Sequence, residues 1–124
     1  MCKWLKLTPV FFWLMLSSCG DPLPTLEGVD LQTWKNDKHG CAGKRFTMMS
    51  SLSSQSKKLL ALSESEIISL LGKPDENELY KRNQKFYYYL IDPSKTCSDT
   101  ISTDPRKLVI RFNAVGLAKE VVIE

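Results

Sequence analysis

The sequence predicts an α+β fold in which N-terminal helices pack on one face of a three- to four-stranded antiparallel meander. Two patterns predict it: apolar residues recur at three- and four-residue steps before Pro74, as in amphipathic helices, and alternate with polar residues after it, as in strands. The chain has 124 residues, and the first 18 have the make-up of an export leader. The remainder suits one small domain.

Two helices are expected in the first half of this domain. Asp30 is a typical N-cap residue, and Trp34 follows at helical spacing on the expected buried side. Gly40 and Gly43 predict a break, so a second helix is expected to begin near Lys44. The side chains expected to face inward from that helix are Phe46, Met49 and Leu52.

A third helix carries the clearest local pattern in the chain. Ser63 and Glu66 have the spacing of a capping box, in which each side chain bonds the backbone N–H of the other residue. Gly72 is expected to end the helix, and Pro74 follows it. The expected buried stripe is Ile67, Ile68, Leu70 and Leu71.

Alternating segments predict the strands. They span residues 78–82, 85–91, 107–113 and 117–123, with turns at 82–84 and 113–116. Residues 92–106 contain two prolines and a cysteine, and they are expected to form a long surface connection.

The N-terminus has three parts. Lys3 and Lys6 are basic, residues 7–16 form an uncharged apolar run, and small residues then surround Cys19. Ten apolar residues are too few to span a bilayer, which needs about twenty in a helix, but they suit an export signal.

The run Leu16-Ser17-Ser18-Cys19-Gly20 resembles the lipobox of bacterial lipoproteins. In that family the cysteine thiol receives a diacylglyceryl group, the leader is cut just before it, and the new amine is usually acylated. The resemblance implies a signal peptide at 1–18, a lipidated tether at 19–28 starting with Cys19, and a single domain at 29–124. The alternative is an ordinary secretory leader with an incidental cysteine.

Cys41 and Cys97 are the two cysteines that remain after the leader and the lipidation site. An exported chain meets an oxidising compartment, so we expect them to form a disulfide. The competing interpretation is a reactive thiol or metal site that also uses His39 and Asp99. The short paired spacings of zinc sites are missing, so no metal or cofactor is expected.

Charge and motif content bear on the function class. The net charge is +3, and it falls to +1 once Lys3 and Lys6 leave with the leader, so nucleic acid is not an expected partner. The sequence has one histidine, no nucleophile elbow and no glycine-rich phosphate loop, which favours a non-enzymatic protein.

A partner-binding patch is expected on the exposed face of the sheet. Tyrosine offers a large contact area with a polar tip, so we expect Tyr87 or Tyr89 to contribute, together with Arg111 and with Lys119 or Glu120. The alternative is a solvated sheet face with no partner. A peptide bound along an open sheet edge is a further possibility.

Residues 60–123 are similar to the small outer-membrane lipoproteins of the SmpA/OmlA type, whose fold the β-lactamase inhibitory proteins share. The similarity rests on Leu70-Leu71-Gly72-Lys73-Pro74-Asp75, Phe86-Tyr87-Tyr88-Tyr89 and Leu108-Val109-Ile110-Arg111-Phe112-Asn113-Ala114-Val115-Gly116. It implies an outer-membrane location and an accessory role in folding barrels into that membrane. The chain departs from the group at Trp34, Cys41 and Cys97.

Together these features predict a membrane-anchored envelope lipoprotein that acts as a non-enzymatic binding or scaffold module. Its expected partners are the lipid bilayer, through acylated Cys19, and an envelope protein. The alternatives are an envelope ligand- or peptide-binding lipoprotein and a thiol-active envelope enzyme. The enzyme would need a reduced Cys41 or Cys97.

Overall fold

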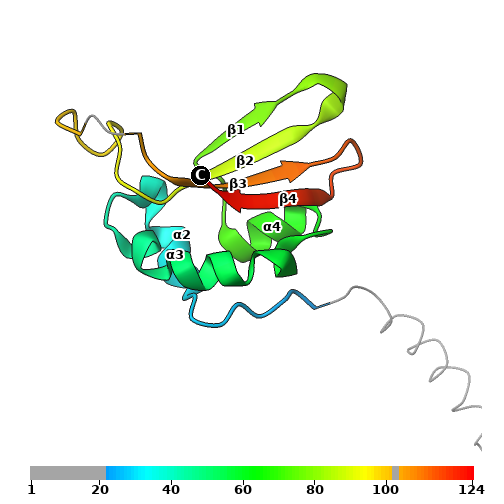
Figure 1. Ribbon diagram of the computed structural model, residues 1–124, viewed down its shortest axis with the longest axis horizontal. Coiled ribbons are helices and arrows are strands. Elements are labelled where there is room, and N and C mark those ends of the chain that lie inside the picture. The colour runs from blue at the N-terminus through cyan, green and yellow to red at the C-terminus, as the bar shows by residue number, and fades with distance from the viewer. Residues whose placement is uncertain (1–21, 102–103) are drawn as a thin grey trace, which may run out of the picture.

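The computed structural model describes residues 22–101 and 104–124. The predictions for the signal peptide and for Cys19 lie outside the described residues. Within them, the predicted α+β architecture is confirmed: helices cover one face of a four-stranded antiparallel sheet with the strand order β1-β2-β3-β4 (Figure 1).

The helical layer and the sheet follow each other in the sequence. The helices are α2 (Leu31–Asn36), α3 (Lys44–Ser54) and α4 (Glu64–Leu71), with short 3-10 segments η1 (Lys38–Gly40), η2 (Ser56–Leu59) and η3 (Lys81–Asn83). The strands are β1 (Glu76–Leu79), β2 (Lys85–Leu90), β3 (Lys107–Phe112) and β4 (Ala118–Ile123). Each strand is antiparallel to the next, so the sheet is a meander.

Both predicted helix caps are confirmed. The Asp30 carboxylate accepts from the backbone N–H groups of Gln32 and Thr33 and starts α2. At α4, Ser63 Oγ accepts from Glu66 N at 3.2 Å, and Glu66 Oε1 accepts from Ser63 N at 2.9 Å. The caps satisfy amides that the first turn of a helix leaves without a partner.

Gly72 ends α4, as predicted, with a positive φ of 85°. A Cβ at this position would also lie 2.9 Å from Cγ of Lys35. Both the backbone conformation and the packing therefore favour glycine there.

The orientation of α3 differs from the prediction. Phe46 is exposed, whereas Arg45, Met48 and Leu52 face the interior, so the expected stripe is one residue out of phase at its start. Arg45 causes the difference, because buried oxygen atoms bind its guanidinium and hold that side of the helix inward. In α4, Ile68 is likewise exposed, while the other three members of the predicted stripe are buried.

The hairpin between β1 and β2 also corrects the prediction, which placed a strand at 78–82. β1 begins at Glu76 and ends at Leu79. Arg82 and Asn83 have φ values of 62° and 60°, the left-handed conformation that a two-residue hairpin turn requires. A strand cannot continue through such a turn, so pairing ends before it.

The hydrophobic core lies between the helices and one face of the sheet. Its fully buried members from the helical layer are Trp34, Leu52, Leu59, Ile67 and Leu71, and those from the sheet are Tyr89, Leu108, Ile110 and Phe112. This face is the covered face of the sheet. None of the helices in residues 22–101 and 104–124 lies on the opposite face, which is called the open face below (Figure 1).

The predicted disulfide between Cys41 and Cys97 is present, with a Cα–Cα distance of 5.5 Å. It joins the segment after η1 to the long connection that follows β2, and its partners are 56 residues apart in the sequence. Closing a loop of this length stabilises a fold by about 4 kcal/mol in the chain-entropy model. The bridge therefore links the helical layer to the connection between β2 and β3.

Candidate functional site

The prediction that Tyr87 or Tyr89 lies on the exposed face of the sheet is wrong, because both rings point to the covered face. Tyr87 is 7% exposed and Tyr89 is 0% exposed. Their hydroxyls donate to Glu64 Oε1 at 2.9 Å and to the backbone oxygen of Gly72 at 2.7 Å. Since each hydroxyl has a partner in or next to α4, the rings can be buried without leaving a polar group unsatisfied.

The strand register places Phe86 and Tyr88 on the open face instead, together with Arg111. Phe86 lies opposite Arg111, which lies opposite Glu120, and Tyr88 lies opposite Val109. The full set of side chains on this face is Glu76, Glu78, Phe86, Tyr88, Leu90, Lys107, Val109, Arg111, Glu120 and Val122. The prediction for Arg111 therefore places it correctly on the accessible side of the sheet.

Aromatic rings and cations form contacts across the open face. The rings of Phe86 and Tyr88 are stacked, with centroids 6.2 Å apart, and Tyr80 meets Phe86 edge-on at 5.0 Å. Lys107 Nζ lies 4.8 Å from the centroid of the Tyr88 ring. Stacking and cation–π contacts hold these partly exposed rings in a defined arrangement.

Acidic groups border the aromatic rings. The Tyr88 hydroxyl donates to Glu78, and burial together with this carboxylate raises the pKa of Tyr88 to about 12. The tyrosine therefore remains a neutral donor near neutral pH. Arg111 Nε donates to Glu120 Oε1 at 3.3 Å, so the cation on the open face is held by its neighbour on β4.

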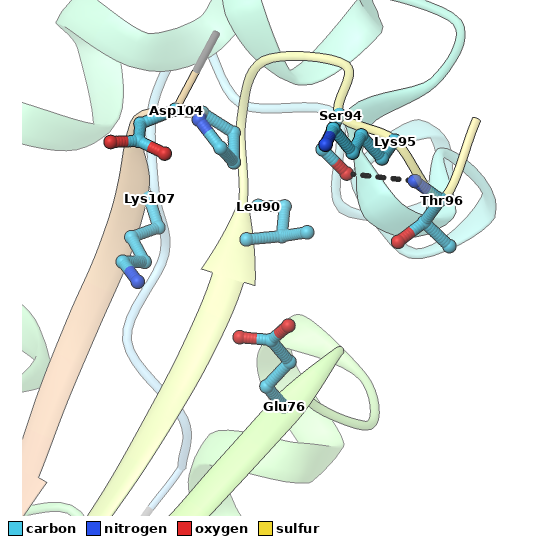
Figure 2. Close-up of a pocket in the computed structure, with 8 residues that line it drawn as sticks. Glu76, Leu90, Ser94, Lys95, Thr96, Asp104 and Lys107 are labelled. Carbon is cyan, nitrogen blue, oxygen red and sulfur yellow. Dashed lines mark hydrogen bonds between the residues drawn. The ribbon is translucent and has the colours of Figure 1, made fainter. Parts of the chain in front are cut away.

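A hollow of about 360 Å³ lies where the open face meets the connection between β2 and β3. Figure 2 shows Glu76, Leu90 and Lys107, from three adjacent strands, with Asp104 of the connection next to Lys107 and with Ser94, Lys95 and Thr96 across from them. Its remaining lining residue is Pro105. Charges of both signs surround the apolar Leu90, which suits polar groups of a bound polypeptide better than an apolar ligand.

A buried ion pair lies beneath the open face, between the helical layer and the sheet. Arg45 and Asp75 meet at 2.6 Å with side-chain exposures of 1% and 3%. Asp75 also accepts from the backbone N–H groups of His39 at 3.1 Å and Leu90 at 2.7 Å. All these contacts are structural, and they join α3, η1 and the end of β2.

A second polar cluster, formed by Glu64, Lys85 and Tyr87, is the closest approach to a catalytic arrangement. Burial acts to raise the pKa of Glu64, but hydrogen bonds from Lys85 and Tyr87 outweigh it and lower this pKa overall. Burial and the hydrogen bond to Glu64 raise the pKa of Tyr87 to about 12. Both shifts move away from neutral pH, so this cluster is suited to holding β2 against α4 rather than to exchanging protons.

Residues 22–101 and 104–124 contain no group of three or more histidine, cysteine or acidic side chains that would hold a metal ion. In the same two segments, every helix is too short or too polar to cross a membrane.

No protein family, curated protein or solved structure matches this chain. The resemblances to the bacterial lipoproteins and to the SmpA/OmlA group therefore remain predictions from the sequence.

Proposed function

We propose that the protein is a lipid-anchored component of a bacterial cell envelope that binds a protein partner through the open face of its sheet, without catalysis. The observation that carries the proposal is the open face itself, where Phe86, Tyr88 and Arg111 remain accessible beside a border of acidic residues. Phe86 and Tyr88 replace the tyrosines expected from the sequence.

The composition of the open face favours protein recognition. Aromatic residues and arginine are enriched among the residues that contribute most to binding energy at protein interfaces. Leu90 and Val109 are already buried between their neighbours on this face. The rings therefore rest on a packed surface, and little side-chain freedom would be lost when a partner binds.

The path of the N-terminal segment supports an anchor on the opposite side of the molecule. Residues 22–29 run along the helical layer, away from the sheet (Figure 1). Gln55 bonds the backbone of Glu27 on both its N–H and its oxygen, and Lys58 Nζ donates to the Thr25 oxygen at 3.0 Å. Acyl chains on Cys19 would draw this side toward the bilayer and leave the open face accessible.

The location in the outer membrane and the accessory role in barrel assembly rest on the sequence resemblance alone. A thiol-active enzyme is the less favoured alternative, because both Cys41 and Cys97 are occupied by their mutual disulfide. Thiol counting on the purified protein tests this alternative, which requires two free thiols.

Site-specific photocrosslinking in intact cells tests the binding surface. A photoreactive amino acid placed at Phe86 or Tyr88 is expected to give the same crosslinked protein from both positions. Phe46 and Ile68 are matched controls, since both are exposed but lie on the helical layer. Crosslinks that are equally strong at the control positions, or none at Phe86 and Tyr88, would contradict the proposed surface.

The anchor has a separate test. Metabolic labelling with palmitate is expected to mark the wild-type protein and not the Cys19→Ser variant, which should also leave the membrane fraction. Unchanged labelling and fractionation of the variant would remove the anchor from the proposal and leave the open face untouched.

A further inference from the structure

We propose that the free edge of β1 binds an extended polypeptide segment with basic residues at alternate positions, which adds to the sheet as a fifth strand. This inference goes beyond the proposed function, because it concerns the backbone of the β1 edge, residues 76–80, rather than Phe86, Tyr88 and Arg111 of the open face. It requires neither the anchor at Cys19 nor a partner on the open face.

Among the described residues, none covers the β1 edge, whereas the other edge of the sheet is covered at the start of β4. All four residues of β1 are exposed, and β2 is its partner on one side only. At the opposite edge, Ala61 N donates to the Ala118 oxygen and Ala118 N donates to the Leu62 oxygen, both at 2.8 Å. The segment before α4 therefore closes the start of β4, while β1 presents unpaired backbone groups, the feature that strand addition uses.

The register identifies these backbone groups. Tyr80 N donates to the Gln84 oxygen next to the turn, and hydrogen-bonded positions alternate along an antiparallel pair. Glu78 and Glu76 therefore direct their backbone groups to β2. The N–H and C=O groups of Asn77 and Leu79 point to the free edge and are the groups that an added strand would bond.

The side chains of β1 define the sequence that fits. Glu76 and Glu78 lie on the open face, and neither forms a salt bridge within residues 22–101 and 104–124. An added strand places its side chains beside theirs, so lysine or arginine at alternate positions is favoured on that face.

Two large hydrophobic side chains are exposed beside these glutamates, Leu79 on the other face of β1 and Tyr80 at the end of the edge. Leu79 is 67% exposed and Tyr80 is 59% exposed, and they line a hollow of about 550 Å³ with Lys81, Arg82 and Gln84. Edge strands that bind nothing usually avoid exposed apolar side chains next to unpaired backbone groups, because such edges promote aggregation. The two exposed apolar side chains at the β1 edge therefore favour a binding role. Aliphatic residues are therefore favoured between the basic residues of the bound segment.

A second copy of this chain fits the same edge poorly. Antiparallel pairing of two β1 strands in one continuous sheet sets each residue against a residue of the same face. Glu76 would then lie opposite Glu78 of the second copy, or the two Glu78 side chains would face each other. Like charges directly opposite each other destabilise strand pairing, so a basic segment is the better occupant.

Fluorescence polarisation with synthetic peptides tests the proposal on the full chain in detergent. The probe is a fluorescent seven-residue peptide that alternates lysine and valine, and it is expected to bind saturably. Two control peptides separate pairing from simple charge attraction. One carries N-methyl groups on the valine amides, which keeps the charges but removes backbone donors, and the other has glutamate in place of lysine. Each is expected to bind at least tenfold more weakly, since one lost hydrogen bond corresponds to about a tenfold change.

Variants of the protein complete the test. Glu76→Lys combined with Glu78→Lys should reverse the preference, so that the glutamate peptide binds better than the lysine peptide. Asn77→Pro should weaken the lysine peptide about tenfold, because proline removes a donor from the free edge. Glu27→Lys combined with Ser50→Lys and Ser53→Lys changes the net charge equally, at exposed positions of the N-terminal segment and α3, and should leave the preference unchanged.

Three results would overturn the proposal. The N-methylated peptide could bind as tightly as the probe, or the control variant at positions 27, 50 and 53 could reverse the preference as fully as the β1 variant. Sedimentation could instead show a dimer without peptide that Glu78→Gln alone strengthens, which would assign the edge to a second copy. None of these results depends on the palmitate or crosslinking experiments, so each proposal can fail on its own.

Discussion

Arg45 is buried between the helical layer and the sheet, a role that the sequence did not predict. It lies in a serine-rich segment, where an arginine is normally expected at the surface. In the structure its Nε donates to the Trp34 oxygen at 3.0 Å, while NH1 donates to the Leu90 oxygen at 2.9 Å and to Asp75. Its guanidinium also lies 4.9 Å from the centroid of the Trp34 ring. These acceptors come together only when the chain folds, so no local sequence pattern predicts that Arg45 is buried.

Arg45→Ala is expected to be strongly destabilising. It leaves the Asp75 carboxylate buried without its cation, and breaking a buried pair in this way typically costs about 3–5 kcal/mol. Urea unfolding measures the loss, and Lys44→Ala at the exposed neighbouring position is the control. Equal midpoints for the two variants would show that the buried pair does not contribute to stability.

Asp92 and Arg106 make the base of the long connection sensitive to acid. Arg106 donates to the two carboxylate oxygens of Asp92 at 2.6 and 2.9 Å, and these hydrogen bonds hold the pKa of Asp92 below its usual value. The carboxylate therefore stabilises the fold above the usual pKa of aspartate, and this contribution disappears as the pH falls through the lowered pKa.

Hydrogen exchange measured across the acidic range tests this contribution. Protection of the Arg106 amide, which donates to Asp92 Oδ2 at 3.0 Å, should be constant at pH 5–8 and fall in more acidic solution. In Asp92→Asn the protection should be lower at neutral pH and lack the additional acid-dependent loss. An identical acid response in the variant would assign the effect to other carboxyl groups.

At the scale of single elements, the capping box of α4 gives the next prediction. Ser63→Ala should lower the free energy of unfolding by about 1 kcal/mol, because the Glu66 amide loses its acceptor. For a domain of this size, the melting temperature should fall by roughly 4–8 °C. Ser53→Ala, at an exposed position inside α3, is the comparison, and a similar fall there would show that the cap has no special importance.

The elements that the sequence predicted well are those specified by neighbouring residues. The caps at Asp30 and Ser63, the stop at Gly72 and the general positions of the four strands each depend on contacts or conformations within a few residues. The turn at Arg82 and Asn83 lies within the predicted turn at 82–84, but the preceding strand was predicted at 78–82 and ran into it. Neither residue is glycine, and positive φ values are uncommon for other residues, so the sequence did not show where the strand ends.

The candidate site was harder to predict because its deciding contacts are long-range. The run of aromatic residues from Phe86 to Tyr89 does not alternate with polar residues, so either set of side chains was able to face the core. Hydrogen bonds on the covered side decide which set faces the core. The Tyr87 hydroxyl donates to Glu64, and the Tyr89 hydroxyl donates to the Gly72 oxygen. Arg111 was placed correctly because a charge within an apolar strand favours the solvent side.

At the scale of the whole molecule, the disulfide between Cys41 and Cys97 should be the largest single covalent contribution to stability. Replacing both cysteines by serine is expected to lower the free energy of unfolding by about 2–5 kcal/mol. Urea denaturation of the variant and of the oxidised protein measures the difference. Reduction of the wild-type protein should reproduce it, and equal stability of all three forms would exclude a stabilising role.

The hold of Gln55 and Lys58 on residues 25–27 has a mechanical consequence. Only five residues lie between position 19 and Thr25, and the six steps from one to the other span about 20 Å when fully extended. A lipid attached there would hold the folded domain at a defined point. Because the tether is short, the distance between the domain and the bilayer would vary little. The height of the sheet above the bilayer, and so the reach of anything that docks on it, would be set by two side chains of the helical layer.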